Sequence, residues 1–288
     1  MQYDITHTTR YRYGDPVLLS HHVARLSPRP LPSQRCLSHV LAIEPTPAVT
    51  REHEDYHGNR MTFFMMEGAH HEMVVTARSR VQVERPEPPG PAASARWEDA
   101  RDHERLPADV IEYVFESPAV RITEEVARYA RPSFPQGRPF LEAVVDLMGR
   151  IHAEFTFDPR ATTVTTPLTE VLHLRRGVCQ DFSQLAVGAL RSMGLAARYV
   201  SGYLETQPPP GRPRMVGADA SHAWVSVYCP GAGWVDLDPT NNLIPGETHV
   251  TLAWGRDYTD VSPLRGVMLG GGGGHDLTVG VDVIRVAG

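Results

Sequence analysis

The stretch Arg175-Arg176-Gly177-Val178-Cys179-Gln180-Asp181-Phe182-Ser183-Gln184-Leu185 decides the fold that this sequence predicts. It indicates a tight glycine turn followed by a helix, because apolar residues recur at helical spacing as far as Met193 and Gly194 follows as a left-handed cap. Cys179 then lies in the first helical turn, where unpaired N–H groups and the helix dipole favour a thiolate. We expect a nucleophile there. The alternative is a small, buried, structural cysteine.

The composition is that of an ordinary soluble globular protein. The chain has 288 residues, enough for roughly two domains, with 41% hydrophobic and 22% charged residues. Its net charge of -6 gives no electrostatic basis for binding nucleic acid or an anionic membrane surface, so neither partner is predicted. All 28 basic residues are arginine, so the protein has no lysine ε-amine of its own to serve as an acyl acceptor.

The cysteines and the N-terminus predict the compartment. Cys36, Cys179 and Cys229 are odd in number and far apart, so they form neither a disulfide framework nor a Cys-x-x-Cys metal site. The N-terminus lacks the basic and apolar regions of a signal peptide, and no apolar run approaches the ~18 residues that span a bilayer. We therefore expect a soluble cytoplasmic protein in a reducing environment.

Residues 1–85 predict an all-β N-terminal domain that resembles an antiparallel sandwich. Alternating segments such as Tyr3–Tyr13 and Glu72–Val83 are separated by turn residues. His21-His22 and His70-His71 suggest a metal site, but neighbouring strand residues point to opposite faces, so neither pair can chelate one ion. We interpret these histidines as ordinary surface or capping residues and expect no metal.

A proline-rich stretch at Arg85–Ala95 indicates that residues 86–107 form a linker. Residues 108–262 then predict an α+β catalytic domain, because helical segments precede short strands in an antiparallel order. Helices are expected at 108–115, 123–130, 139–155 and from Cys179, and strands at 197–204, 223–229 and 234–238, with a mobile loop at 207–211. Residues 263–288 predict a flexible glycine loop and a final strand; no Lys-Ser/Thr completes a phosphate-binding loop.

A cysteine nucleophile needs a base and a third group that orients the base. His222 opens one predicted strand and Asp238 closes the next, so a hairpin centred near residue 230 would place them almost opposite one another. Asp236 lies on the same strand face, and alternation alone does not exclude it. The residues therefore predict a Cys/His/Asp site with two candidates for the carboxylate.

Four segments in this order resemble the bacterial transglutaminase-like family. They are Gly177–Phe182, Ala197–Tyr203, Ser221-His222-Ala223-Trp224 and Gly233–Thr240. The core around residues 150–245 is similar to the papain-like superfamily of transglutaminases, peptide N-glycanases and cysteine proteases, and residues 1–85 resemble the β-rich domain that accompanies it. The resemblance implies a nucleophile helix packed on an antiparallel sheet.

Carried over by position, the resemblance implies Cys179 as nucleophile, His222 as general base and acid, and Asp238 as the orienting carboxylate. It selects Asp238 over Asp236 because the family motif is Trp, three residues, then Asp-Pro-Thr. It implies no cofactor and no metal. The glycanase branch is disfavoured because its zinc-binding Cys-x-x-Cys pairs are missing. The segment Gly255–Pro263 also resembles a family element, with either a structural or a substrate-contacting role.

The expected activity is acyl transfer or hydrolysis at a peptide or side-chain amide bond of a protein or peptide substrate, through a thioester. Water as acceptor makes the enzyme a protease or amidase, and an amine makes it a transglutaminase; the residues do not decide between them. The alternatives are a non-catalytic binding module on the same fold and a metal-assisted hydrolase.

Overall fold

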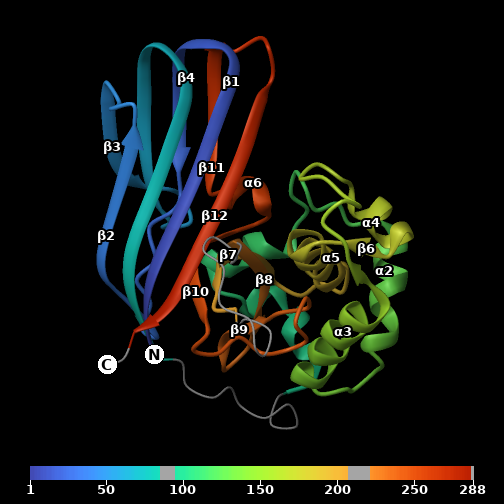
Figure 1. Ribbon diagram of the computed structural model, residues 1–288. Helices are drawn as coiled ribbons and strands as arrows, with labels where there is room; N and C mark the ends of the chain where they lie inside the picture. The colour runs from blue at the N-terminus through green and yellow to red at the C-terminus, as the bar shows by residue number, and fades with distance from the viewer. Residues whose placement is uncertain (85–94, 207–220, 287–288) are drawn as a thin grey trace, which may run out of the picture.

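The computed structural model describes residues 1–84, 95–206 and 221–286, and it shows a tall β-sandwich beside an α+β core (Figure 1). The loop predicted at 207–211 and most of the proline-rich stretch lie outside the described residues. The rest of the predicted linker is packed rather than extended. Short 3-10 helices cover Trp97–Arg101 (η2) and His103–Arg105 (η3), and Trp97 is buried in the core, so the linker prediction is wrong for this part.

One antiparallel sheet, folded over itself, forms the sandwich. Its two longest strands, β1 and β4, each turn back near their midpoints, and their two halves pack face to face around Val17, Met66 and Met73. One half is completed by the strands at 275–286 and 34–44, and the other half by the strands at 264–270 and 49–54. The six strands are β1 (Gln2–Ala24), β2 (Gln34–Glu44), β3 (Val49–Glu54), β4 (Arg60–Val83), β11 (Leu264–Gly270) and β12 (His275–Val286).

The C-terminal segment belongs to this sandwich. We expected residues 263–288 to be a separate loop and strand, but β11 pairs with Val17–Ala24 and β12 with Gln2–Tyr13, both on β1. The glycines at 270–274 form the turn between them. The two ends of the chain therefore complete one sheet, as the blue and red strands of Figure 1 show.

The core belongs to the predicted α+β class and contains a four-stranded antiparallel sheet in the order β10-β7-β8-β9, in which β10 was not predicted. Its strands are β7 (Ala197–Leu204), β8 (Ser221–Cys229), β9 (Gly233–Leu237) and β10 (His249–Gly255), and a small parallel pair is formed by β5 (Thr156–Phe157) and β6 (Arg176–Gly177). The helices are α1 (Ala108–Ile111), η4 (Glu112–Val114), α2 (Glu124–Ala130), η5 (Arg131–Ser133), α3 (Phe140–Glu154), α4 (Leu168–Leu174), α5 (Cys179–Ser192) and α6 (Tyr258–Val261).

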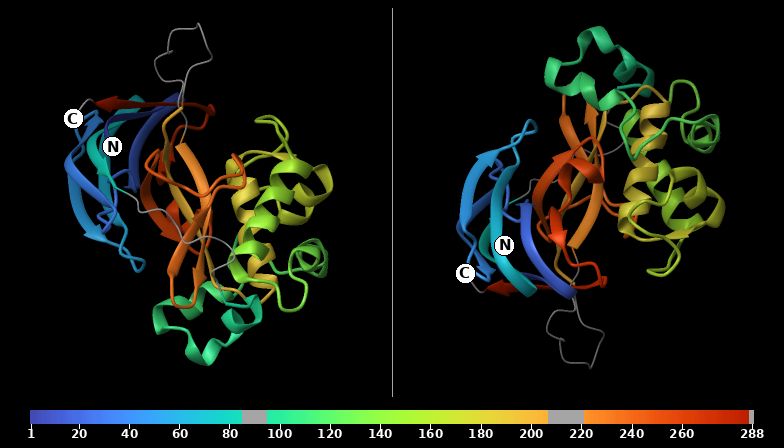
Figure 2. Two further views of the ribbon diagram at one scale, coloured as in Figure 1. Left: turned by 90° about the horizontal axis from the view of Figure 1, so that it is seen from below. Right: turned by 90° about the horizontal axis from the view of Figure 1, so that it is seen from above.

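The four-stranded sheet lies between the sandwich and the helices (Figure 2). One continuous hydrophobic core joins all three layers: it contains Tyr3 and Val283 of the sandwich, Tyr203 of the sheet and Leu185 of α5. The predicted N-terminal and catalytic regions therefore share one hydrophobic core. Of the described residues, none lies in a helix that is both long and apolar enough to cross a membrane.

The paired histidines of the sandwich alternate between faces, as expected for a strand. We expected surface or capping histidines; His22 and His70 are buried, so these two are not surface residues. Their buried rings bond locally, His22 Nε2 to Ser20 Oγ at 2.9 Å and His70 Nδ1 to the Gly68 carbonyl at 2.9 Å. Burial lowers the pKa of His22 to about 4, which keeps its ring neutral at physiological pH.

Gly202 on β7 is required by the packing of its neighbours. A Cβ at this position would lie 2.1 Å from the Val250 carbonyl oxygen and 2.4 Å from the Trp224 ring. We expect Gly202→Ala to destabilise the fold by about 1–3 kcal/mol, because neither backbone nor buried indole can move aside cheaply. Thermal unfolding should show a lower Tm. Gly246→Ala is the control, since no atom lies within 4 Å of its Cβ position; equal Tm values for the two variants would contradict this prediction.

Candidate active site

The nucleophile turn is shaped by Arg175 rather than by Gly177. Helix α4 ends at Arg175, which adopts a left-handed conformation (φ +53°), and the chain then passes through β6 into Cys179. The sequence predicted that a glycine makes this turn, but the residue with the left-handed conformation is Arg175. The Arg175 side chain bonds Glu154 at 2.8 Å and stacks on the rings of Tyr129 and Phe155, which holds this strained residue in place.

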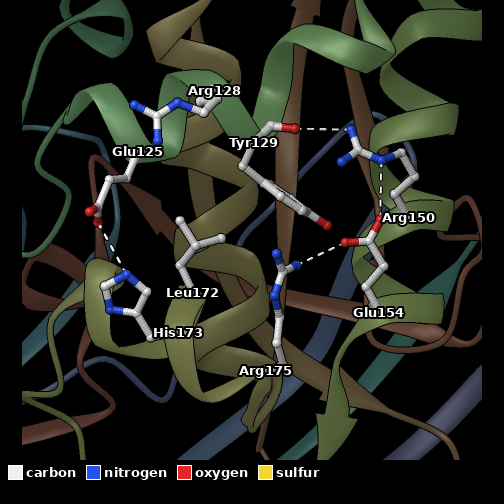
Figure 3. Close-up of a pocket in the computed structure, with 8 residues that line it drawn as sticks. All are labelled: Glu125, Arg128, Tyr129, Arg150, Glu154, Leu172, His173 and Arg175. Carbon is white, nitrogen blue, oxygen red and sulfur yellow. Dashed lines mark hydrogen bonds and ion pairs between the residues drawn. The ribbon is translucent and has the colours of Figure 1, made fainter.

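Figure 3 shows the pocket in which Arg175 lies, lined by side chains of α2, α3 and α4. Its charged groups pair with one another: Arg150 and Arg175 both bond Glu154, and Glu125 lies 3.6 Å from His173. These contacts between side chains of α2, α3 and α4 therefore hold Arg175, at the start of the nucleophile turn, in place.

Gly177 is needed for a different reason. The carboxylate of Asp181 accepts hydrogen bonds from the Val178 N–H at 2.8 Å and from Thr162 Oγ1 at 2.6 Å. A Cβ on Gly177 would lie 2.6 Å from Asp181 Oδ2, so only glycine leaves room for this cap. Asp181 is buried, and the burial raises its pKa. The cap fixes the backbone on both sides of Cys179 at the start of α5.

His222 and Asp238 meet as the sequence predicts. The β8–β9 hairpin exists, and His222 Nε2 lies 2.7 Å from Asp238 Oδ2. The register differs slightly from the expected one: Val225 pairs with Leu237, so Asp238 follows opposite Trp224 and reaches His222 diagonally. Asp236 instead lies near Arg198, where its negative charge partly offsets the lowering of the arginine's pKa by burial. The structure thus places Asp238, not Asp236, at the histidine.

Cys179 lies near the same imidazole. Helix α5, which begins at Cys179, packs against β8, and the cysteine contributes to the raised pKa of His222. Because Nε2 is directed at Asp238, Nδ1 is the nitrogen left for the thiol. Cys179 is partly exposed, whereas Cys229 is buried. The structure therefore shows the His222–Asp238 hydrogen bond directly and places the start of α5, with Cys179, beside the strand that carries His222.

Asp238 is completely buried and accepts an unusually full set of hydrogen bonds. Its Oδ2 also faces Asn241 Nδ2 at 2.7 Å and His249 Nε2 at 3.2 Å, while its Oδ1 accepts the backbone N–H groups of Thr240 and Asn241 at 3.0 and 3.2 Å. Burial alone would raise the pKa of this carboxyl, but the donors outweigh it and hold the pKa well below its usual range.

The imidazole of His222 is shifted in the opposite direction. Burial disfavours its charged form, but the hydrogen bonds and charges of Asp238 and Cys179 outweigh the burial and raise its pKa from the usual 6.5 to about 10. At neutral pH the ring therefore carries a proton next to the thiol. This is the charge state that a thiolate–imidazolium pair requires.

Residues 3–82 match the bacterial transglutaminase-like N-terminal region, and residues 127–239 match the transglutaminase-like superfamily. An uncharacterised protein of Mycobacterium tuberculosis is 41% identical over 295 residues, which cover 100% of this chain and 94% of that protein. The chain belongs to the bacterial transglutaminase-like family. The resemblance seen in the four sequence segments is confirmed, and so is the α+β fold that it implied.

Other comparisons agree with this assignment to the transglutaminase-like family. An uncharacterised Mycobacterium leprae protein is 34% identical, over 98% of each chain. A protein-glutamine gamma-glutamyltransferase of Pseudomonas aeruginosa is 29% identical over 128 residues, 38% of this chain and 19% of that protein. A crystal structure of a candidate cysteine protease from Cytophaga hutchinsonii superposes with a TM-score of 0.77 over 100% of this chain and 92% of that one, at 18% identity; it shares the fold.

Two partners of Asp238 in this transglutaminase-like core were not singled out from the sequence. Asn241 follows the Asp-Pro-Thr motif directly, so its position next to the carboxylate was a detectable signal. His249 is eleven residues from Asp238 on another strand, and no local spacing points to it. Only the chain's return across the end of the sheet brings it to the site.

His222, Asp238 and His249 are the one group of three metal-type ligands among the described residues. Their arrangement fits hydrogen bonding better than a shared ion. The His222–Asp238 distance of 2.7 Å is shorter than the ~3.3 Å that separates two ligands of a tetrahedral zinc ion, and Asn241 also occupies the same oxygen. We therefore assign these contacts to positioning of the carboxylate.

The segment Gly255–Pro263 links the layers of the molecule. Asp257 caps α6 through the Thr259 N–H and accepts the Ala119 N–H at 2.8 Å. Asp260 binds Arg256 and lies 3.2 Å from His57 Nε2 of the sandwich. Of the two roles considered for this segment, these contacts favour the structural one.

Proposed function

We propose that this protein is a cysteine-dependent acyl-transfer enzyme that cleaves a peptide or side-chain amide bond through a thioester on Cys179. The observation that supports the proposal is the hydrogen bond from His222 to the buried carboxylate of Asp238, on a strand that packs against the helix beginning at Cys179. A partly exposed thiol, a protonated imidazole and a fixed carboxylate are the groups that nucleophilic acyl transfer needs.

In the first half-reaction the Cys179 sulfur attacks the carbonyl carbon of the amide, and a tetrahedral oxyanion forms. The C–N bond then breaks as His222 gives its proton to the departing nitrogen, which leaves a thioester on Cys179. The raised pKa of His222 suits this step, because the ring holds its proton at neutral pH. Cys179 begins α5, so its own backbone N–H is available as one donor to the oxyanion.

In the second half-reaction water or a primary amine attacks the thioester carbonyl. His222 takes the proton from the attacking group, the C–S bond breaks, and the thiolate is restored. Throughout, Asp238 holds the imidazole with Nε2 directed at its carboxylate, so that Nδ1 stays directed at the sulfur. The names of the two distant relatives, a glutamyltransferase and a cysteine protease, correspond to the two acceptors.

The test is a panel of glutamine-containing and other peptides, incubated with and without a fluorescent primary amine. We expect turnover that is accompanied by an acyl adduct on Cys179 in intact-protein mass spectra. Amine incorporation identifies a transferase, and release of ammonia or of cleaved peptide alone identifies a hydrolase. Because the chain has no lysine, its own side chains provide no ε-amine that competes with the probe.

The proposal fails if no donor in the panel is turned over and no adduct forms on Cys179. In that case the protein is better described as a binding module on a transglutaminase-like fold, and direct peptide binding by the Cys179→Ala variant would be the next measurement.

A further inference from the structure

His249 occupies a position from which it can control the carboxylate of the site. It is the first residue of β10, its side chain is fully buried, and its Nε2 lies 3.2 Å from Asp238 Oδ2. This is the same oxygen that His222 contacts. The residue therefore acts on His222 through the carboxylate that they share.

The surroundings of His249 fix which nitrogen donates to the carboxylate. An ionised carboxylate only accepts, so the Nε2 that faces Asp238 carries a hydrogen, and Nδ1 lies 3.1 Å from the hydroxyl of Thr248. The Trp224 ring meets the imidazole edge-on, with centroids 5.3 Å apart and planes at 86°, and the His222 ring centroid lies 6.0 Å away. Two of the groups that it contacts, Asp238 and His222, are titratable.

The geometry points to His249 as a positioning residue for acyl transfer: an N–H donor that fixes the Asp238 carboxylate and weakens the attraction between that carboxylate and His222. This inference rests on the proposed function. With three side-chain donors, from His222, Asn241 and His249, Oδ2 has no freedom to rotate away from His222. Each donor also takes up part of the negative charge that His222 experiences.

The sandwich holds β10, the strand that begins with His249. Gln34, which is buried, bonds the backbone of Thr251 twice, through Nε2 to the carbonyl at 2.7 Å and through Oε1 from the N–H at 2.8 Å. Asn59 bonds the backbone of Trp254 in the same two-sided manner. The N-terminal region thus fixes the strand that begins at His249, which gives that region a part in the site.

Two substitutions separate the N–H donor from the shape of the ring. His249→Phe keeps an aromatic ring of similar shape but removes the donor, whereas His249→Gln places an amide N–H near the position of Nε2. We expect His249→Phe to lower kcat about tenfold, the cost of one hydrogen bond of typical strength, with little change in KM. We expect the alkaline limb of its kcat profile to move to higher pH, because Asp238 then stabilises the charged His222 more strongly. His249→Gln should retain kcat within about threefold of wild type, since the donor is kept.

The same variants are examined without substrate, by following alkylation of individual cysteines with iodoacetamide as a function of pH. Cys36 is the internal control, since it lies on β2. Equal kcat values and equal Cys179 pH profiles for wild type, His249→Phe and His249→Gln would overturn the inference. If the wild type turns nothing over and Cys179 is alkylated no faster than Cys36, the proposed function itself has failed. A lower Tm for both variants with unchanged pH profiles would show a purely structural histidine and would also overturn the inference.

Discussion

Replacement of Cys179 by alanine is expected to reduce turnover by at least about 10³-fold, because the thioester cannot form without the sulfur. The fold should survive, since Cys179 is only partly buried at the first turn of α5 and the Asp181 cap on Val178 stays intact. The measurements are kcat/KM on the donor identified in the peptide panel, the acyl adduct in intact-protein mass spectra, and Tm.

Cys36→Ala is the matched control for the Cys179 variant. Cys36 is also partly exposed, but it lies on β2 of the sandwich, where its thiol bonds the nearby Ser38 carbonyl. We expect its activity to equal that of wild type. Turnover by Cys179→Ala that stays within a few-fold of the control would show that the reaction does not pass through this thiol.

Asp238→Asn is expected to cause the second largest loss, about 10³-fold in kcat/KM, because the amide cannot hold His222 in the required tautomer. The NH₂ group of the new asparagine is a donor. The groups that contact Asp238, such as His222 and His249, are donors as well. At least one pair of donors must therefore face one another in the variant. Asp236→Asn is the control, since Asp236 pairs with Ser226, four residues along β8 from His222; we expect its kcat/KM to stay within a few-fold of wild type.

The Asp238 variant should also change how stability depends on pH. The folded-state pKa of His222, about 10, lies above the usual 6.5, so its contribution to stability is complete below about pH 6.5 and is lost as pH rises toward 10. The pKa of Asp238 is lowered, so its contribution is present at neutral pH and is lost in acid. Urea unfolding of wild type should show stability falling from pH 6.5 to 9, and Asp238→Asn should flatten that slope. An equally steep slope in the variant would contradict the assigned partnership.

Local sequence patterns predicted most elements of this fold. Alternation in the first 85 residues predicted the sandwich strands, helical spacing predicted α3 and α5, and the segments 197–204 and 223–229 became β7 and most of β8. The α4 helix was not predicted. It is only seven residues long, and the Thr-rich residues before it show no helical pattern. These successes share a cause, because side-chain periodicity is set by the backbone geometry of a single element.

The candidate site was predicted to the extent that its residues lie in local motifs. A cysteine that opens a helix and a His–Asp pair on a short hairpin follow from spacing, and in the structure the pair is hydrogen-bonded and the helix packs against the strand of the histidine. The register was offset, because the hairpin turn is centred about one residue later than the sequence suggested. Family resemblance selected Asp238 over Asp236, and its contact with His222 agrees with that choice.

The sequence by itself thus determined the helix that begins at Cys179, the strands that carry His222 and precede Asp238, and the family. Only the tertiary structure decided that Arg175 makes the turn, that the two ends of the chain share one sheet, and that His249 reaches Asp238. The physical reason is the range of the interactions. A helix or a hairpin is encoded by neighbours in the chain, whereas a buried carboxylate takes its donors from whatever strands the shared core packs around it.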